Sequence, residues 1–301
     1  MTGLTDYITD HPWVEVFTVW YVLIDDAYQA ILADYGRRLR PRGPEPRFSD
    51  SEVITLALII DTYFHGHEAL GLAFVRQYHP AEFPQVLSPS RFNRRRRLLV
   101  DVIEAIRTRL TTRLIDPADR LRLIDSAPIP MTTYTRGPDC RTVQGWDYCG
   151  VCISKRQKVF GFKLHLLTTA DQVVDQWLVA PASYHDSTVA PAVLEDRRDL
   201  LVPGDKAYVR PEIQRTLQEG RRIVLLAPPR RTDRVQWVAA QERRYNRVRR
   251  RIETALSVLT VVFNVERPGS RSLAGALCRI ATRILAYTLS FRTTHVLASL
   301  N

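Results

Sequence analysis

The sequence predicts an α/β domain with an all-helical module before it and long helices after it, and three observations support that fold class. Residues 1–117 carry apolar side chains at helical spacing. After Pro117, short apolar runs alternate with helical segments, which is typical of a sheet covered by helices. From about residue 238 onward the spacing is helical again. We therefore expect two domains, at 1–117 and 118–301.

The N-terminal module is expected to contain four helices. Ser49 and Glu52 form a capping box ahead of an apolar run dense enough for a buried helix. Ser90 is expected to cap the last helix, after a segment punctuated by prolines. The expected helices cover residues 12–33, 53–60, 69–78 and 91–114.

In the second part, short apolar runs are read as strands and amphipathic segments as helices. The expected strands cover residues 121–124, 159–167, 173–180, 200–202 and 223–227. Short helices are expected at 191–194 and 211–218, and long helices at 238–263 and 272–295.

The charge balance favours a polyanionic partner. Lys and Arg number 43 against 32 Asp and Glu, which gives a formal net charge of +11 and a pI near 9.8. Nearly all of the basic residues are arginines, whose planar guanidinium binds phosphate oxygens bidentately. Codon bias in a GC-rich genome also produces an arginine excess, but it does not account for the net charge.

The composition also indicates the cellular compartment in which the protein acts. Four cysteines in 301 residues are too few for a disulfide scaffold. Asp6 and Asp10 lie where a signal peptide would be basic, and the apolar runs fall short of a membrane span. We therefore expect a cytoplasmic, nucleoid-associated protein with no membrane partner.

Three acidic residues lie at positions that suit catalysis. Asp125 and Asp205 each follow an expected strand, and Glu253 lies in the long arginine-rich helix. Side chains at strand ends face the crevice in which open α/β sheets build their sites. Three converging carboxylates form a hard-oxygen site for Mg²⁺ or Mn²⁺, and two such ions can activate a water or a 3′-hydroxyl in phosphodiester chemistry.

Each acid also has a simpler interpretation. Acids at strand ends are often turn residues or caps, and Arg249 and Arg250 lie four and three residues before Glu253, at the spacing of helix-surface ion pairs. Against this, Glu253 lies about 100° around the helix from the apolar stripe, at the border between core and solvent. That border position suits a side chain that lines a crevice.

Five short strings resemble the DDE transposases of bacterial insertion sequences, and most of all the insertion-sequence 982 family. They are Leu-Ile-Asp-Ser-Ala-Pro-Ile-Pro at 123–130, Phe-Gly-Phe-Lys-Leu-His at 160–165, Pro-Ala-Ser-Tyr-His-Asp at 181–186, Gly-Asp-Lys-Ala-Tyr at 204–208 and Arg-Arg-Ile-Glu-Thr at 250–254. Segments 48–58 and 90–97 also resemble the helical region of that family. The resemblance implies a helical DNA-end-binding module at 1–117 and a DDE catalytic domain at 118–301.

The resemblance implies a ribonuclease H-like catalytic core in which Asp125, Asp205 and Glu253 bind two Mg²⁺ ions, with Mn²⁺ as a substitute. It implies cleavage of double-stranded DNA at the element's ends and transfer of the 3′-OH ends to target DNA, by a homodimer that holds two ends. Only 47 residues separate Asp205 from Glu253, too few for a large inserted domain. Of a related tyrosine, arginine, glutamate and lysine signature, Arg249 matches, whereas Asn246 and Thr260 replace the tyrosine and lysine.

Further candidates surround the three acids. His185, Lys206, His165 and Lys163 are candidates for a supporting shell around phosphate or a metal-bound water; the alternatives are a core histidine and, for the neighbouring Asp186, a helix cap. Two arginine clusters are candidates for phosphate contacts with DNA, although some members could form an ordinary solvated face. The clusters are Arg94, Arg95, Arg96 and Arg97, and Arg243, Arg244, Arg247, Arg249, Arg250 and Arg251.

Two rival functions remain open from the sequence. One is a DNA-binding regulator without catalysis, derived from a transposase. The other is a nuclease that cuts without strand transfer, because the same metals serve both reactions.

Overall fold

The computed structural model describes residues 13–36, 44, 46–152, 157–229, 234 and 236–298. The expectation drawn from Asp6 and Asp10 lies outside these residues. The chain forms two compact units. Unit 1 consists of Met1–Leu114 and Val261–Asn301, and unit 2 of Ile115–Thr260.

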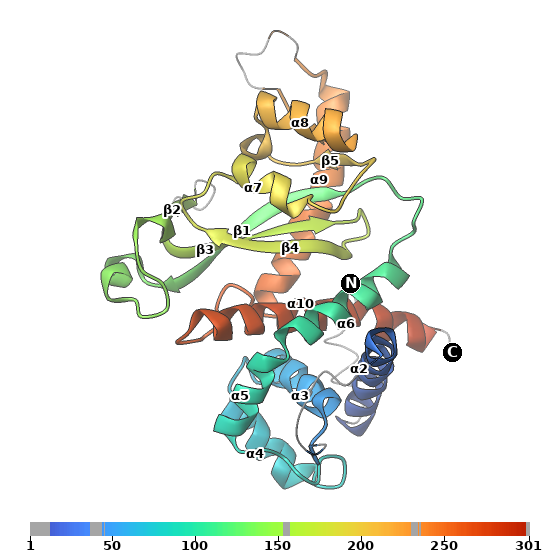
Figure 1. The fold of residues 1–301 in the computed structure, drawn as a ribbon. Coiled ribbons are helices and arrows are strands. Elements are labelled where there is room, and N and C mark those ends of the chain that lie inside the picture. Colours follow the sequence, from blue (N-terminus) through green and yellow to red (C-terminus); the bar gives the residue numbers. More distant parts are fainter. Residues whose placement is uncertain are drawn as a thin grey trace. The chain divides into compact units, whose positions relative to one another are not determined.

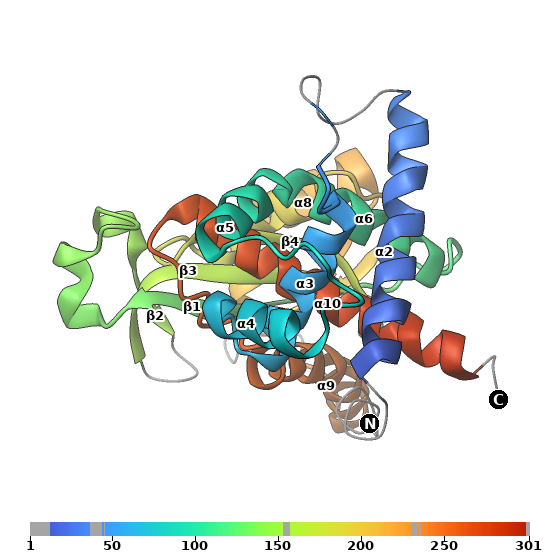
Figure 2. The ribbon, with the colours of Figure 1, turned by 90° about the horizontal axis from the view of Figure 1, so that it is seen from below.

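The described residues of unit 1 form helices joined by loops, as predicted. It contains α2 (Trp13–Tyr35), α3 (Asp50–Tyr63), α4 (Glu68–Tyr78), α5 (Pro89–Leu98), α6 (Val100–Leu114) and α10 (Leu273–Ala298). The buried helix α3 lies between α2 and α5 (Figure 1, Figure 2), and α10 packs on α3 and α6. The predicted capping box is present, because the Ser49 hydroxyl accepts the Glu52 N–H at 3.1 Å and the Glu52 carboxylate accepts the Ser49 N–H.

Three predictions for this unit were wrong. The single helix expected at 91–114 is two helices, because the Leu99 N–H bonds the Arg96 carbonyl and ends α5. The cap of α5 is Ser88, with Pro89 in the first helical position, rather than Ser90. In addition, residues 261–301 group with the N-terminal helices, because α10 packs on α3 and α6, whereas the sequence grouped them with the catalytic domain.

One described helix, α2, is long and apolar enough to cross a membrane by length and composition, which the sequence analysis did not anticipate. Its buried residues, which include Phe17, Trp20 and Ile24, lie at helical spacing along one face. The helix packs on α3 and α6. The apolar face of α2 is therefore accounted for by the core of unit 1.

Unit 2 is built on a sheet with helices around it. Its strands are β1 (Leu123–Thr132), β2 (Cys149–Cys152), β3 (Gln157–Thr168), β4 (Val174–Pro181), β5 (Leu201–Pro203) and β6 (Val224–Leu226). Strands β1, β3 and β4 pair antiparallel, β2 pairs with the start of β3, and β5 pairs parallel with β6. Two parallel bridges, Leu121 with Leu201 and Ile124 with Gly204, join β5 to β1.

Helices complete unit 2. They are α7 (Asp186–Val193), α8 (Pro211–Arg221) and α9 (Ala239–Val261), with the short 3-10 helices η1 (Tyr134–Asp139), η2 (Trp146–Tyr148) and η3 (Lys206–Tyr208). Helices α7 and α8 lie together on one side of the strands (Figure 1), where they bury Val193 and Leu217 against Ile124 and Val202. The α/β class predicted from the sequence is confirmed.

The first strand is longer than predicted. We expected it to end before Asp125, but β1 continues to Thr132 through Pro128 and Pro130. Proline interrupts a strand only where its missing N–H would be needed for pairing. Among the described residues, β1 is bridged to β5 only as far as Ile124, so the edge beyond it tolerates both prolines.

Candidate active site

The contact between β1 and β5 brings two acids of unit 2 together. Asp125 is the third residue of β1, and Asp205 lies two residues after the end of β5, as the cap of η3. Gly204 bridges to Ile124, and a Cβ at Gly204 would lie 2.5 Å from the Ile124 side chain. The absence of a side chain at Gly204 therefore allows the close approach that sets Asp205 beside Asp125.

Helix α9 contributes the third acid. Its Tyr245 is buried and donates a hydrogen bond to the Gly204 carbonyl, with a second contact of 3.3 Å to the Leu226 carbonyl. Ile252 and Leu256 of the same helix are buried as well. Tyr245 thus ties α9 to the ends of β5 and β6, and Glu253 follows two turns later on the helix.

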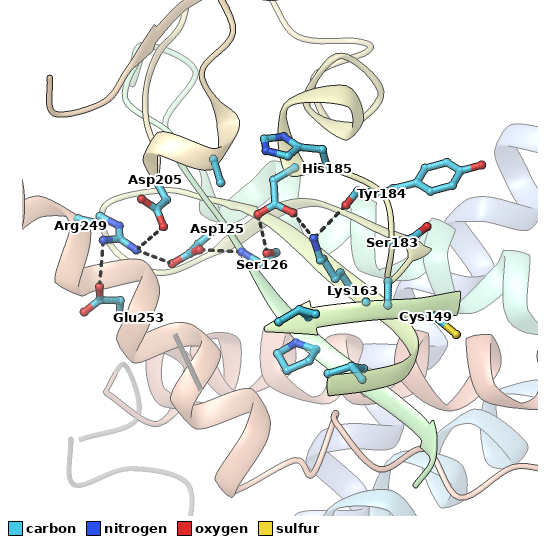
Figure 3. Close-up of a pocket in the computed structure, with 17 residues that line it drawn as sticks. Asp125, Ser126, Cys149, Lys163, Ser183, Tyr184, His185, Asp205, Arg249 and Glu253 are labelled. Carbon is cyan, nitrogen blue, oxygen red and sulfur yellow. Dashed lines mark hydrogen bonds and ion pairs between the residues drawn. The ribbon is translucent and has the colours of Figure 1, made fainter. Parts of the chain in front are cut away.

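One guanidinium group joins the three carboxylates (Figure 3). Arg249 Nη2 lies 3.4 Å from Asp125 Oδ2 and 4.0 Å from Asp205 Oδ2, and Arg249 Nη1 lies 3.7 Å from Glu253 Oε1. The Asp125 side chain is 15% exposed, whereas those of Asp205 and Glu253 are each 50% exposed. The ion pair between Arg249 and Glu253 that the sequence suggested is present, but Arg249 also pairs with both aspartates.

The three carboxylates suit a hard divalent cation in ligand type and in charge. All three side chains offer carboxylate oxygens, which Mg²⁺ and Mn²⁺ prefer, and the cluster already attracts a cationic group. Within the described parts of the chain, no three His, Cys, Asp or Glu side chains lie close enough to share one metal ion. The guanidinium of Arg249 lies among the carboxylates instead.

Burial raises the pKa of Asp125 from 3.8 to about 6. Arg249 and the Ser126 N–H, which donates to Asp125 Oδ1 at 2.8 Å, oppose that rise, and the charge of Asp205 adds to it. A cation beside Asp125 therefore stabilises a carboxylate that its surroundings otherwise disfavour.

The acids line one part of a cavity of about 570 Å³ that continues past Lys163 and Tyr184. Lys163 Nζ donates to Asp186 Oδ1 at 2.8 Å and to the Tyr184 carbonyl at 2.9 Å, and Ser126 Oγ donates to Asp186 Oδ2 at 3.3 Å. These contacts are drawn in Figure 3. They hold an ammonium group in the same cavity as the three carboxylates.

The other supporting candidates occupy different surroundings. His165 is fully buried and does not line the cavity; its Nδ1 lies 2.8 Å from the Tyr208 hydroxyl, and burial lowers its pKa to about 4. His185 lines the cavity, but its Nδ1 accepts the Ser187 N–H as the cap of α7. Lys206 is exposed, and its backbone N–H, at 2.6 Å from Asp205 Oδ1, makes the contact with the acid.

The arginine candidates divide into exposed and buried groups. Five of them are exposed on α9, namely Arg243, Arg244, Arg247, Arg250 and Arg251. Arg94 and Arg97 are exposed on α5. By contrast, the assignment of Arg95 and Arg96 to DNA contact was wrong, because Arg95 is buried against Asp50 and Arg96 against Asp61 and Glu68.

Several residues of the site escaped the sequence analysis. Tyr245 had no motif or spacing to mark it, and Ser126 and Tyr184 lie in the strings at 123–130 and 181–186 but were given no role. An aromatic residue in an otherwise arginine-rich helix is the one signal that could have identified Tyr245 as buried. Asp186 was noted only as a possible cap, since its contact with Lys163 depends on the pairing of β3 with β4.

Comparison with known proteins gives one match. A family model described as the transposase DDE domain matches residues 116–289, which include Asp125, Asp205 and Glu253. Neither the curated proteins nor the solved structures contain a match to the chain. The matched segment runs from the start of unit 2 into α10 and covers more than half of the sequence. The chain therefore belongs to the transposase DDE domain family.

Proposed function

We propose that the protein is the transposase of a bacterial insertion sequence related to the insertion-sequence 982 family, with a ribonuclease H-like core in unit 2. Asp125, Asp205 and Glu253 are the catalytic carboxylates and hold two Mg²⁺ ions, for which Mn²⁺ substitutes. The enzyme cleaves the ends of its element and transfers the 3′-OH ends to target DNA. It acts in the cytoplasm on the nucleoid, as a homodimer that holds two ends.

One observation carries this proposal. Three carboxylates from a strand, a strand end and a helix lie within 4.0 Å of one guanidinium. Their convergence from residues 125, 205 and 253 is hard to explain as capping or surface pairing alone. The DDE transposase family generally uses divalent metal ions, and carboxylate oxygens suit that role.

Lys163 and the exposed arginines of α9 have different roles in binding the DNA. When bound, the divalent ions supply Lewis-acid activation of the attacking oxygen and stabilise the charge on the leaving oxygen. Lys163, held by Asp186 and Tyr184, places a positive charge where a phosphate oxygen of the strand would enter the cavity. The exposed arginines of α9 neutralise backbone phosphates on either side of that point.

We expect Arg249 to exchange the three acids for a DNA phosphate as its partner when metal ions bind. In the metal-free protein it neutralises the three acids, and once these bind metal ions its guanidinium is free to bind a DNA phosphate. This reconciles its place among the carboxylates with the phosphate contact expected from its cluster.

The proposal is tested by strand cleavage and joining of labelled DNA that carries the sequence flanking this gene, with Mg²⁺ or Mn²⁺. Wild type is compared with Asp125→Ala, Asp205→Ala and Glu253→Ala. We expect cutting and joining in wild type, and loss of both with retained DNA binding in all three variants. Cutting without joining would indicate the nuclease, and binding without cutting would indicate the regulator.

A further inference from the structure

Helix α5 contains five arginines that face in two opposite directions. Phe92, Arg95 and Arg96 form its buried face. Arg95 Nε lies 3.0 Å from Asp50 Oδ1, and Arg96 pairs with Asp61 and with Glu68 Oε1, the latter at 3.2 Å. These pairs join α5 to α3 and α4, and they fix the rotation of α5 about its own axis.

That rotation turns a second set of arginines outward. Arg91, Arg94 and Arg97 follow one another at a spacing of three residues and are all exposed. At about 100° per residue they lie on the side opposite Phe92. Among the described residues, none of the three guanidiniums has an acidic side chain as ion-pair partner, and α5 itself contains no acid.

The surface next to these arginines is also unusual. Leu98 is 72% exposed at the end of the same face, although leucine is normally buried. Ser90 is exposed at the start of the face. Helix α5 lies at the edge of unit 1, with α3 between it and α2 (Figure 2). An outward helix face with three exposed arginines and one exposed leucine matches a partner that offers both anionic and apolar groups.

The dimensions of the face match the DNA major groove. A rise of ~1.5 Å per residue separates the three arginines by steps of ~4.5 Å and spreads them over ~9 Å, which is about three base pairs. The major groove is ~12 Å wide and admits an α-helix; arginine there binds guanine O6 and N7 bidentately, and an apolar side chain contacts the thymine methyl group.

We propose that α5 is the helix that reads the element's ends, with Arg91, Arg94 and Arg97 contacting guanines in the major groove and Leu98 contacting a neighbouring thymine methyl. The inference rests on the proposed function, because it takes the ends of the element as the DNA. It assigns sequence recognition to α5 and leaves the arginines of α9 to backbone phosphates, so that specificity and general affinity reside in different units.

The test measures binding of the full chain, with EDTA to prevent cleavage, to a duplex of the gene's flanking sequence and to a scrambled duplex. Alanine variants of Arg91, Arg94 and Arg97 are compared with Arg113→Ala, which removes an exposed arginine from α6 in the same unit. Each α5 variant is expected to lower the ratio of specific to scrambled affinity by about 5- to 150-fold, the range of one bidentate base contact. Arg113→Ala should leave that ratio unchanged.

Two further measurements separate base reading from phosphate binding. Arg94→Lys keeps the charge but loses the bidentate geometry. It should therefore lower the ratio of specific to scrambled affinity and keep the salt dependence of wild type. Replacing individual guanines in the end by 7-deazaguanine removes N7; it should weaken wild type but add nothing to the loss in the matching arginine variant.

The proposal is overturned if the α5 variants weaken both duplexes equally and each lowers the salt slope by about one, which is the behaviour of a phosphate contact. It is also overturned if they change neither affinity. If wild type cleaves and joins the flanking DNA while the variants keep the wild-type ratio, the inference fails and the transposase function stands. If wild type neither distinguishes nor cuts that DNA, both fail.

Discussion

Replacing Asp125 by Asn should stabilise the metal-free protein at neutral and alkaline pH, although the residue is proposed to be catalytic. The pKa of Asp125 is raised from 3.8 in the unfolded chain to about 6 in the fold, chiefly by burial. Between these values the folded protein holds a proton that the unfolded chain has released. The contribution of this carboxyl group to stability is therefore fully present below about pH 4 and is lost as the pH rises through about 6.

The magnitude follows from the difference in pKa. About two pKa units at ~1.36 kcal/mol per unit correspond to about 3 kcal/mol of folding free energy lost by pH 8. Asparagine keeps the shape and the acceptor for the Ser126 N–H without the charge. Asp125→Asn should accordingly raise the free energy of unfolding at pH 8 by ~2–3 kcal/mol, and by much less at pH 4.5.

The assay is urea unfolding of wild type and variant in EDTA at pH 4.5 and pH 8. Asp205→Asn is the matched control, since that side chain is 50% exposed and its replacement should change stability by less than ~0.5 kcal/mol. If Asp125→Asn were no more stable than wild type at pH 8, or equally stabilised at both pH values, burial of the Asp125 charge would not be the cause.

Three further predictions concern other parts of the chain. Arg249→Gln removes the cation that competes for the three carboxylates, so Mn²⁺ should bind about tenfold more tightly by calorimetry, with Arg250→Gln as the exposed control; weaker binding would contradict the competition. Gly161 has a φ of +153°, and a Cβ there would lie 2.3 Å from the Ile129 carbonyl oxygen, so Gly161→Ala should lower stability by at least ~2 kcal/mol. Gly220→Ala, on α8 with no atom within 4 Å of the added carbon, should raise stability by ~0.5 kcal/mol, and equal effects at the two glycines would refute this. Asp61→Asn removes the fully buried one of the two carboxylates that pair with Arg96, leaving only Glu68, and should cost ~3–5 kcal/mol in thermal or urea unfolding, whereas Asp61→Leu combined with Arg96→Met should recover most of that loss.

Periodicity located most of the elements, because the apolar faces that it detects are the ones the fold buries. It gave the five strands β1, β3, β4, β5 and β6 and the helix that carries Glu253. It missed β2, which has only four residues around Gly150, and the end of β1, where the prolines resemble a turn. Both errors concern strands whose existence depends on pairing with β3 rather than on their own composition.

The three acids could be found from position and motif, but their common partner could not. Arg249 was assigned to DNA because it belongs to the arginine cluster of residues 243–251, and only the approach of α9 to β1 and β5 shows which carboxylates it meets. The run Arg94 to Arg97 illustrates the same limit. Four identical residues in a row carry no signal of which two face Asp50 and Asp61, since that depends on how α5 packs on α3.

The central claim is that Asp125, Asp205 and Glu253 form the divalent metal site, and anomalous diffraction from crystals soaked in Mn²⁺ tests it most directly. We expect Mn²⁺ peaks among these three carboxylates, with the guanidinium of Arg249 moved away from them. No Mn²⁺ peak at these residues, with Arg249 still paired to all three acids at saturating metal, would contradict it.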